Sequence, residues 1–61
     1  MTDAEIITMV HSLCKKAKFA YPGDGNDWSR YEFSKRHILD WNLTPVQYEL
    51  AIKTIAKELG V

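Results

Sequence analysis

Residues 43–61 read LTPVQYELAIKTIAKELGV, and this stretch contains the signals for both ends of one α-helix. Thr44 is placed to cap the first turn, and Pro45 takes the first helical position, where a missing N–H costs nothing. Gly60 supplies the left-handed residue with which many helices end. The stretch therefore predicts a helix over about residues 44–59, and with it a folded domain.

Other side chains of this stretch agree with that helix. Gln47 is placed to complete a capping box, and Leu43 and Tyr48 have the spacing of a hydrophobic staple. Glu49 and Lys53 form a favourable pair four residues apart on the face expected to be solvent-exposed. The apolar side chains that we expect this helix to bury are Tyr48, Ala51, Ile52, Ile55 and Leu59.

The N-terminal third predicts a second helix, over about residues 2–20. Thr2 and Glu5 match a capping box, with Met1 and Ile6 placed as its staple. The apolar residues follow the spacing of one helical face, and they are Ile6, Val10, Leu13, Ala17 and Ala20, with Ile7 and Cys14 beside them. Residues 21–27, with one proline and two glycines, read as a loop.

The middle of the chain, about residues 28–40, predicts a third helix. Asp27 or Ser29 is placed to cap it, and Ser29 with Glu32 has capping-box spacing. Residues 31–33 also alternate as a short strand would, but a lone strand has no partner, so we favour the helix. Trp28, Tyr31, Ile38 and Trp41 lie near one face of this helix, and Phe33 and His37 form a second face.

Size and composition place these helices in one domain spanning residues 1–61. The 61 residues are 46% hydrophobic, which is too high for a disordered chain, and so short a domain has marginal stability. The single Cys14 excludes an internal disulfide, so we favour a homodimer over a monomer. We expect an all-α three-helix domain, without a signal peptide or membrane span, in the cytoplasm.

Candidate catalytic and metal sites are weak. His11, Cys14 and His37 barely reach the number of ligands that zinc requires, and Asp24 starts no EF-hand because Lys35 occupies the twelfth position. A Cys/His nucleophilic pair lacks a third, orienting group. We therefore expect no metal, no cofactor and no enzymatic activity.

The aromatic residues of the middle segment are the better candidates for function. We expect a larger protein to bind them, because buried aromatic and arginine side chains dominate interface energies. The alternative is that Tyr31 and Trp41 belong to the core. The expected partner-binding residues are Trp28, Arg30, Tyr31, Phe33, Arg36 and Trp41.

A second hypothesis is nucleic-acid binding by the same region. Eight basic and eight acidic side chains balance over the whole chain, but residues 15–37 contain six basic and three acidic ones. Basic residues interleaved with aromatic ones suit phosphate contacts and base stacking. The residues concerned are Lys15, Lys16, Lys18, Arg30, Lys35 and Arg36.

Residues 43–61 also carry the pattern Leu-Thr-Pro-x-Gln-Tyr-Glu-x-Ala-Ile with a Leu-Gly-Val end. This pattern resembles the C-terminal helix of small accessory proteins encoded by phages and prophages. The resemblance covers about the last third of the chain and transfers no catalytic residue. It implies a small protein that binds a larger host or defence protein and modulates or inhibits it.

Overall fold

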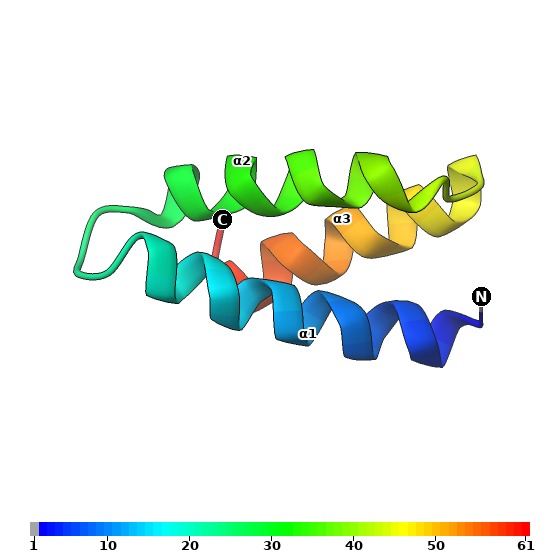
Figure 1. The fold of residues 1–61 in the computed structure, drawn as a ribbon, viewed down its shortest axis with the longest axis horizontal. Coiled ribbons are helices and arrows are strands. Elements are labelled where there is room, and N and C mark those ends of the chain that lie inside the picture. Colours follow the sequence, from blue (N-terminus) through cyan, green and yellow to red (C-terminus); the bar gives the residue numbers. More distant parts are fainter. Residues whose placement is uncertain (1) are drawn as a thin grey trace.

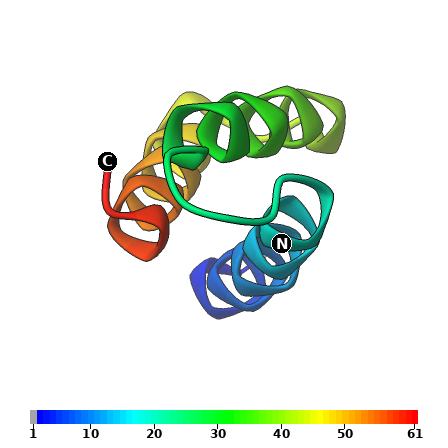
Figure 2. The same ribbon diagram turned by 90° about the vertical axis from the view of Figure 1, so that its left-hand side faces the viewer.

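The fold is all-α, as the sequence predicts. The computed structural model describes residues 2–61, so the expected staple of Met1 lies outside the described residues. The helices are α1 (Asp3–Ala20), α2 (Asp27–Ile38) and α3 (Pro45–Leu59), with a 3-10 turn, η1 (Leu39–Trp41), after α2. No strand occurs in the described part of the chain. Each helix packs against both others, and α1 runs antiparallel to α2 (Figures 1 and 2).

The ends of α1 and α3 are capped as predicted. The Thr2 hydroxyl accepts from the backbone N–H of Glu5 at 3.2 Å, and Thr44 accepts from Gln47 in the same way at 3.2 Å. The backbone N–H of Thr2 donates to the Glu5 carboxylate at 3.1 Å and lowers the pKa of Glu5. Gly60 ends α3 with φ of 77°. These contacts lie within single turns, so local sequence determines them.

The start of α2 differs from the prediction. The helix begins at Asp27, directly after Asn26, and the Asn26 side chain does not cap it. Ser29 already lies inside the first turn, so the predicted capping box of Ser29 with Glu32 is wrong. Asn26 donates its side-chain amide to the carbonyl of Pro22 at 2.8 Å and thereby holds the preceding loop. The strand considered for residues 31–33 is also excluded, because they are helical.

Asn42 ends the short 3-10 turn that follows α2. After η1, this residue adopts the left-handed conformation with φ of 53°, which asparagine tolerates better than most residues. The chain then turns and places Leu43 against the core before α3 begins. The sequence analysis predicts a helix to about residue 40 and does not predict this turn.

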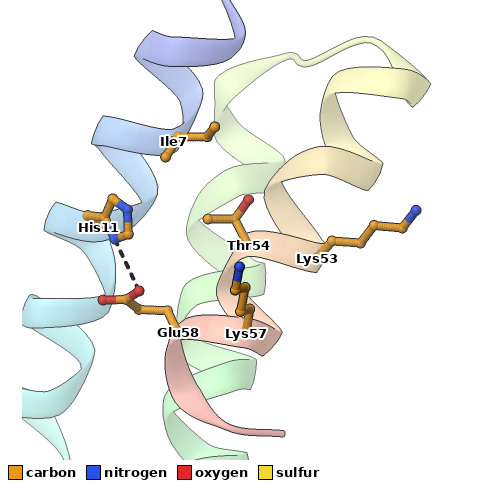
Figure 3. A pocket seen from close by; sticks show the side chains of 6 residues that line it. All are labelled: Ile7, His11, Lys53, Thr54, Lys57 and Glu58. Atoms are coloured by element: carbon orange, nitrogen blue, oxygen red, sulfur yellow. Dashed lines mark ion pairs between the residues drawn. The ribbon is translucent and has the colours of Figure 1, made fainter.

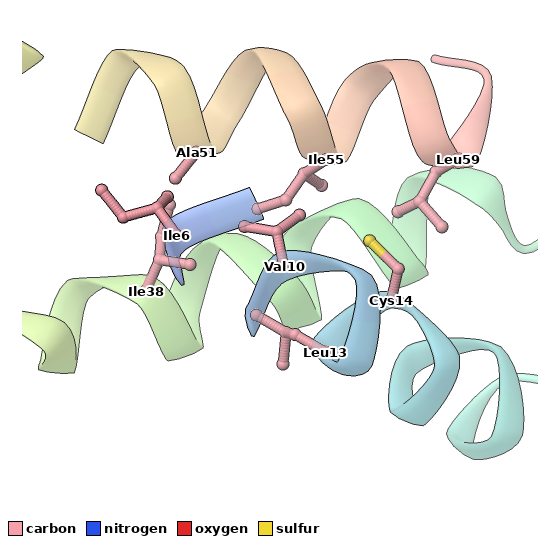
Figure 4. Packing of buried hydrophobic residues seen from close by; sticks show 8 residues of the cluster. All are labelled: Ile6, Val10, Leu13, Cys14, Ile38, Ala51, Ile55 and Leu59. Carbon is pink, nitrogen blue, oxygen red and sulfur yellow. The ribbon is translucent and has the colours of Figure 1, made fainter. Parts of the chain in front are cut away.

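The core is one apolar cluster between the three helices (Figure 4). Ile6, Val10 and Ala51 are fully buried in it, and Tyr48 and Ile52 pack against it from the half-buried zone. Ala20, which the spacing placed on the apolar face of α1, is exposed instead because the helix ends there. The cluster consists of Ile6, Val10, Leu13, Cys14, Ile38, Ala51, Ile55 and Leu59.

One polar side chain interrupts this core. Ser34 of α2 is fully buried, and its hydroxyl oxygen has no hydrogen-bond partner of ordinary geometry among the described residues. The hydroxyl lies near the Cys14 thiol, a weak partner whose pKa it lowers slightly against the larger opposite effect of burial. A buried hydroxyl without a good partner destabilises the fold.

Candidate interaction surface

Arg30 fixes the loop between α1 and α2. Its Nε donates to the carbonyl of Tyr21 at 2.9 Å and its Nη2 donates to the carbonyl of Gly23 at 2.8 Å. Its Nη1 lies 3.2 Å from the Asp27 carboxylate, and only 14% of the Arg30 side chain is exposed. All three guanidinium nitrogens therefore bind within the chain, and Arg30 acts as a structural residue that positions Tyr21.

Tyr21, once positioned, forms one wall of an aromatic hollow on the outer face of α2. Its ring meets Phe33 edge-on, with centroids 6.0 Å apart, and Phe33 lies 4.3 Å from the His37 ring. Trp28 stacks on Tyr31 at 5.3 Å and yet is 64% exposed. The hollow measures about 330 Å³ and is lined by Tyr21, Trp28, Ser29, Glu32, Phe33, Arg36 and His37.

A second hollow continues from the first, between α1 and the end of α2. It measures about 350 Å³ and is lined by Thr8, Met9, Ser12, Leu13, Lys16, His37 and Trp41. Since His37 lines both hollows, they form one surface along α2, which we call the α1–α2 surface. Phe33, His37 and Trp41 follow one another at four-residue intervals along it.

The orientation of His37 at this junction is fixed. Its Nδ1 lies 2.9 Å from the carbonyl oxygen of Phe33. A carbonyl only accepts hydrogen bonds, so Nδ1 carries the proton and donates. In the neutral ring Nε2 then lacks a proton and can only accept a hydrogen bond.

The structure brings only some of the predicted partner-binding residues together on one surface. Trp28, Phe33 and Arg36 line the first hollow, and Trp41 lines the second. Tyr31, Phe33 and Trp41 are half-buried and also pack against the core. The sequence prediction missed Tyr21, His37 and Met9. The four-residue spacing of Phe33 and His37 was a signal for one of them.

The basic residues do not form one face. Successive helix residues point about 100° apart, so Lys15 and Lys18 lie on neighbouring positions of one face of α1 and Lys16 points away from both. Of these three, Lys16 lines the α1–α2 surface. Lys35 is half-buried, and Arg30 is engaged with the loop. The six side chains considered for phosphate binding therefore lie on more than one face of the described structure.

A third hollow lies on the other side of α1, against α3 (Figure 3). Nδ1 of His11 lies 3.2 Å from a carboxylate oxygen of Glu58 and joins the two helices there. The remaining lining residues are Ile7, Lys53, Thr54 and Lys57. No three metal-ligating side chains gather anywhere in residues 2–61.

The Cys14 thiol points into the core rather than into this hollow (Figure 4). Burial raises the pKa of Cys14, and the Glu58 carboxylate raises it further, whereas Lys18 and the Ser34 hydroxyl act in the opposite direction. A protonated, buried thiol is a poor nucleophile. Cys14 therefore has the environment of a core residue.

Comparison of the chain with protein-family models, with curated proteins and with solved structures found no match. None of the helices in the described range is long and apolar enough to cross a membrane.

Proposed function

We propose that the chain is a protein-binding module that acts by covering a surface of a larger protein. The observation that supports this proposal is Trp28, a tryptophan in the first hollow that leaves 64% of its surface in water. Tyr21, in the same hollow, is exposed as well. Both are large side chains whose burial would favour binding and whose exposure does nothing for folding.

The magnitude of this effect is considerable for so small a chain. An aromatic side chain buries about 150–250 Å² when it is covered, and burial contributes about 25 cal/mol per Å². Covering the exposed parts of Trp28 and Tyr21 would thus contribute roughly 4–6 kcal/mol to association before its entropic cost. Such side chains in a pocket are typical interface hot spots.

The biological part of the proposal rests on the resemblance of residues 43–61 to small phage and prophage accessory proteins. In that setting the chain is a cytoplasmic inhibitor or modulator of a host or defence protein. The competing possibility is that a second copy of this chain is the partner. A homodimer and a complex with a larger protein would differ in mass. Nucleic acid is a weaker candidate, because Arg30 is engaged with the loop and Lys35 is half-buried.

The test is capture of partners by the tagged protein from bacterial lysate, with and without nuclease. The proposal predicts one larger protein that is retained after nuclease treatment and that Trp28→Ala fails to capture. Val46→Ala is the matched control, because Val46 is 78% exposed on α3 and lines neither hollow of the α1–α2 surface. Retention that disappears with nuclease would overturn the proposal in favour of nucleic acid.

A further inference from the structure

We infer that the outer stripe of α2 binds the same stripe of a second copy of this chain, with the two helices antiparallel. The outer stripe is the set of four side chains Trp28, Glu32, Arg36 and Leu39. This dimer goes beyond the proposed function and does not depend on it. The inference rests on the exposure of the stripe, on the order of its side chains and on their charges.

The outer stripe lies on the side of α2 away from the core. Ser34 and Ile38, which are fully buried, each lie two residues from Arg36, a step of about 200° around the helix. The other two helices, α1 and α3, pack on the buried side of α2 (Figures 1 and 2). The outer stripe therefore faces solvent.

The side chains of the outer stripe are exposed and its charges are unpaired. Trp28 and Leu39 are 64% and 61% exposed, although both are large and apolar. Glu32 and Arg36 are exposed between them, and neither has an ion-pair partner within residues 2–61. The stripe thus presents two apolar groups and two opposite charges that the fold itself does not use.

The four side chains follow one line along the helix. Trp28 and Leu39 are eleven residues apart and point in directions that differ by about 20°, with Glu32 and Arg36 four residues apart between them. Leu39 follows α2 directly and keeps helical backbone angles, φ of −61° and ψ of −30°, so it continues this line. The stripe is about 17 Å long, or three turns. Its order is apolar, acidic, basic, apolar.

This order is complementary to itself when it is reversed. In an antiparallel pair of α2 helices related by a two-fold axis, Trp28 lies opposite Leu39 of the second copy, and Glu32 lies opposite Arg36 of the second copy. The midpoint of residues 28 and 39 and the midpoint of residues 32 and 36 differ by half a residue, so one axis serves both pairs. The contact contains two ion pairs at its centre and one apolar pair at each end.

The charges favour this arrangement over a parallel one. In a parallel two-fold pair, each side chain lies near its own counterpart, so Glu32 would meet Glu32 and Arg36 would meet Arg36 of the second copy. Like charges opposite one another oppose association, whereas opposite charges favour it and fix the register. A second copy already carries the complementary order, which is why we name it as the occupant.

The dimer covers Trp28, the residue through which we propose that a larger protein is bound. If the proposed function also holds, the second copy and the larger protein exclude each other at this residue. A contact of one helix pair is small, and small interfaces are typical of weak, transient complexes. The chain is therefore a monomer in dilute solution and a reversible dimer when concentrated.

The test is sedimentation equilibrium of the whole chain from about 10 μM to about 1 mM, a range suited to a weak dimer. The inference predicts that the mass rises from that of one chain toward that of two. Glu32→Arg and Arg36→Glu, measured separately, are each expected to raise the dissociation constant about tenfold or more. Lys15→Glu, the matched control, reverses the charge of an exposed side chain on α1 and should change this constant less than about threefold.

A mixture of the two charge-reversed variants tests the pairing itself. The stripe of Glu32→Arg carries two basic side chains and that of Arg36→Glu two acidic ones, so neither variant pairs well with itself. Mixed together, they again place opposite charges across the contact, and the mixture is expected to dimerise as the parent does. The chain that combines both substitutions should dimerise as well. Circular dichroism of each variant checks that the fold is unchanged, since both side chains are exposed.

The possible results separate this inference from the proposed function. A mass of one chain at every concentration, a dimer that Lys15→Glu weakens as much as the two reversals do, or a mixture that stays monomeric would overturn the inference. If a lysate partner is still captured through Trp28 in any of these cases, the proposed function stands without the dimer. If the dimer forms as predicted and no larger protein is captured, the proposed function fails and the inference stands.

Discussion

Ser34→Ala is expected to stabilise the protein, although most core substitutions destabilise. The Ser34 hydroxyl is fully buried and has no partner of ordinary geometry within residues 2–61. Leaving such a group unsatisfied costs about 1–3 kcal/mol, and the nearby Cys14 thiol places the gain near the lower end, at about 1 kcal/mol. Alanine also exceeds serine in helix propensity by about 0.5 kcal/mol. The free energy of unfolding should thus rise by about 1.5 kcal/mol.

Ser12→Ala separates the two contributions. Ser12 lies inside α1 and is exposed, so its replacement gains the helix propensity alone, about 0.5 kcal/mol. Urea unfolding, followed by tryptophan fluorescence, measures both variants against the parent. A change of about 1 kcal/mol in the free energy of unfolding also shifts the melting temperature of a domain this small by about 4–8 °C. A difference of this size between the two variants is therefore measurable. If Ser34→Ala is no more stable than Ser12→Ala, or is less stable than the parent, the interpretation of Ser34 is refuted.

Three further predictions concern Arg30, Cys14 and Trp28. Arg30→Lys keeps the charge but cannot donate to the carbonyls of Tyr21 and Gly23 in the same fork geometry, so the free energy of unfolding should fall by about 1–2 kcal/mol in urea. An unchanged midpoint would contradict the structural role of Arg30. Burial raises the pKa of the Cys14 thiol above its value in the unfolded chain. The contribution of this thiol to the free energy of unfolding is therefore fully present below about pH 8.5 and is lost as the pH rises further. Cys14→Ala should remove this decline between pH 7.5 and 9.5, and an identical slope in both proteins would contradict it. Trp28→Ala should leave the free energy of unfolding within about 0.5 kcal/mol of the parent value, because Trp28 is mostly exposed. Loss of the folded circular dichroism spectrum would show instead that Trp28 belongs to the core.

Much of the fold could be predicted from the sequence because its decisive contacts are local. The capping boxes of Thr2 and Thr44 join residues three apart, and the apolar spacing of α1 and α3 follows one helical face. The start of α2 could not be predicted in the same way. It depends on Arg30, which reaches back nine residues to Tyr21, and no pattern within one turn contains that contact.

The candidate site could be predicted only in part, for a related reason. Helical spacing grouped Trp28 with Tyr31, Ile38 and Trp41, but it does not say how far along α2 the neighbouring helices extend. The structure leaves Trp28 exposed and buries Ile38. Tyr21 and Met9 belong to other segments of the chain, so their place beside Phe33 and Trp41 follows from packing.

The most direct test of the central claim, that the α1–α2 surface is the binding surface, is an amide and indole correlation spectrum of the ¹⁵N-labelled protein on addition of the captured partner. The account predicts that the indole signals of both Trp28 and Trp41 shift or broaden, together with the amides of Phe33 and His37. Signals of Ile7, Thr54 and Lys57, in the hollow between α1 and α3, should stay in place. A response centred on those three residues, with both indole signals unchanged, would contradict the account.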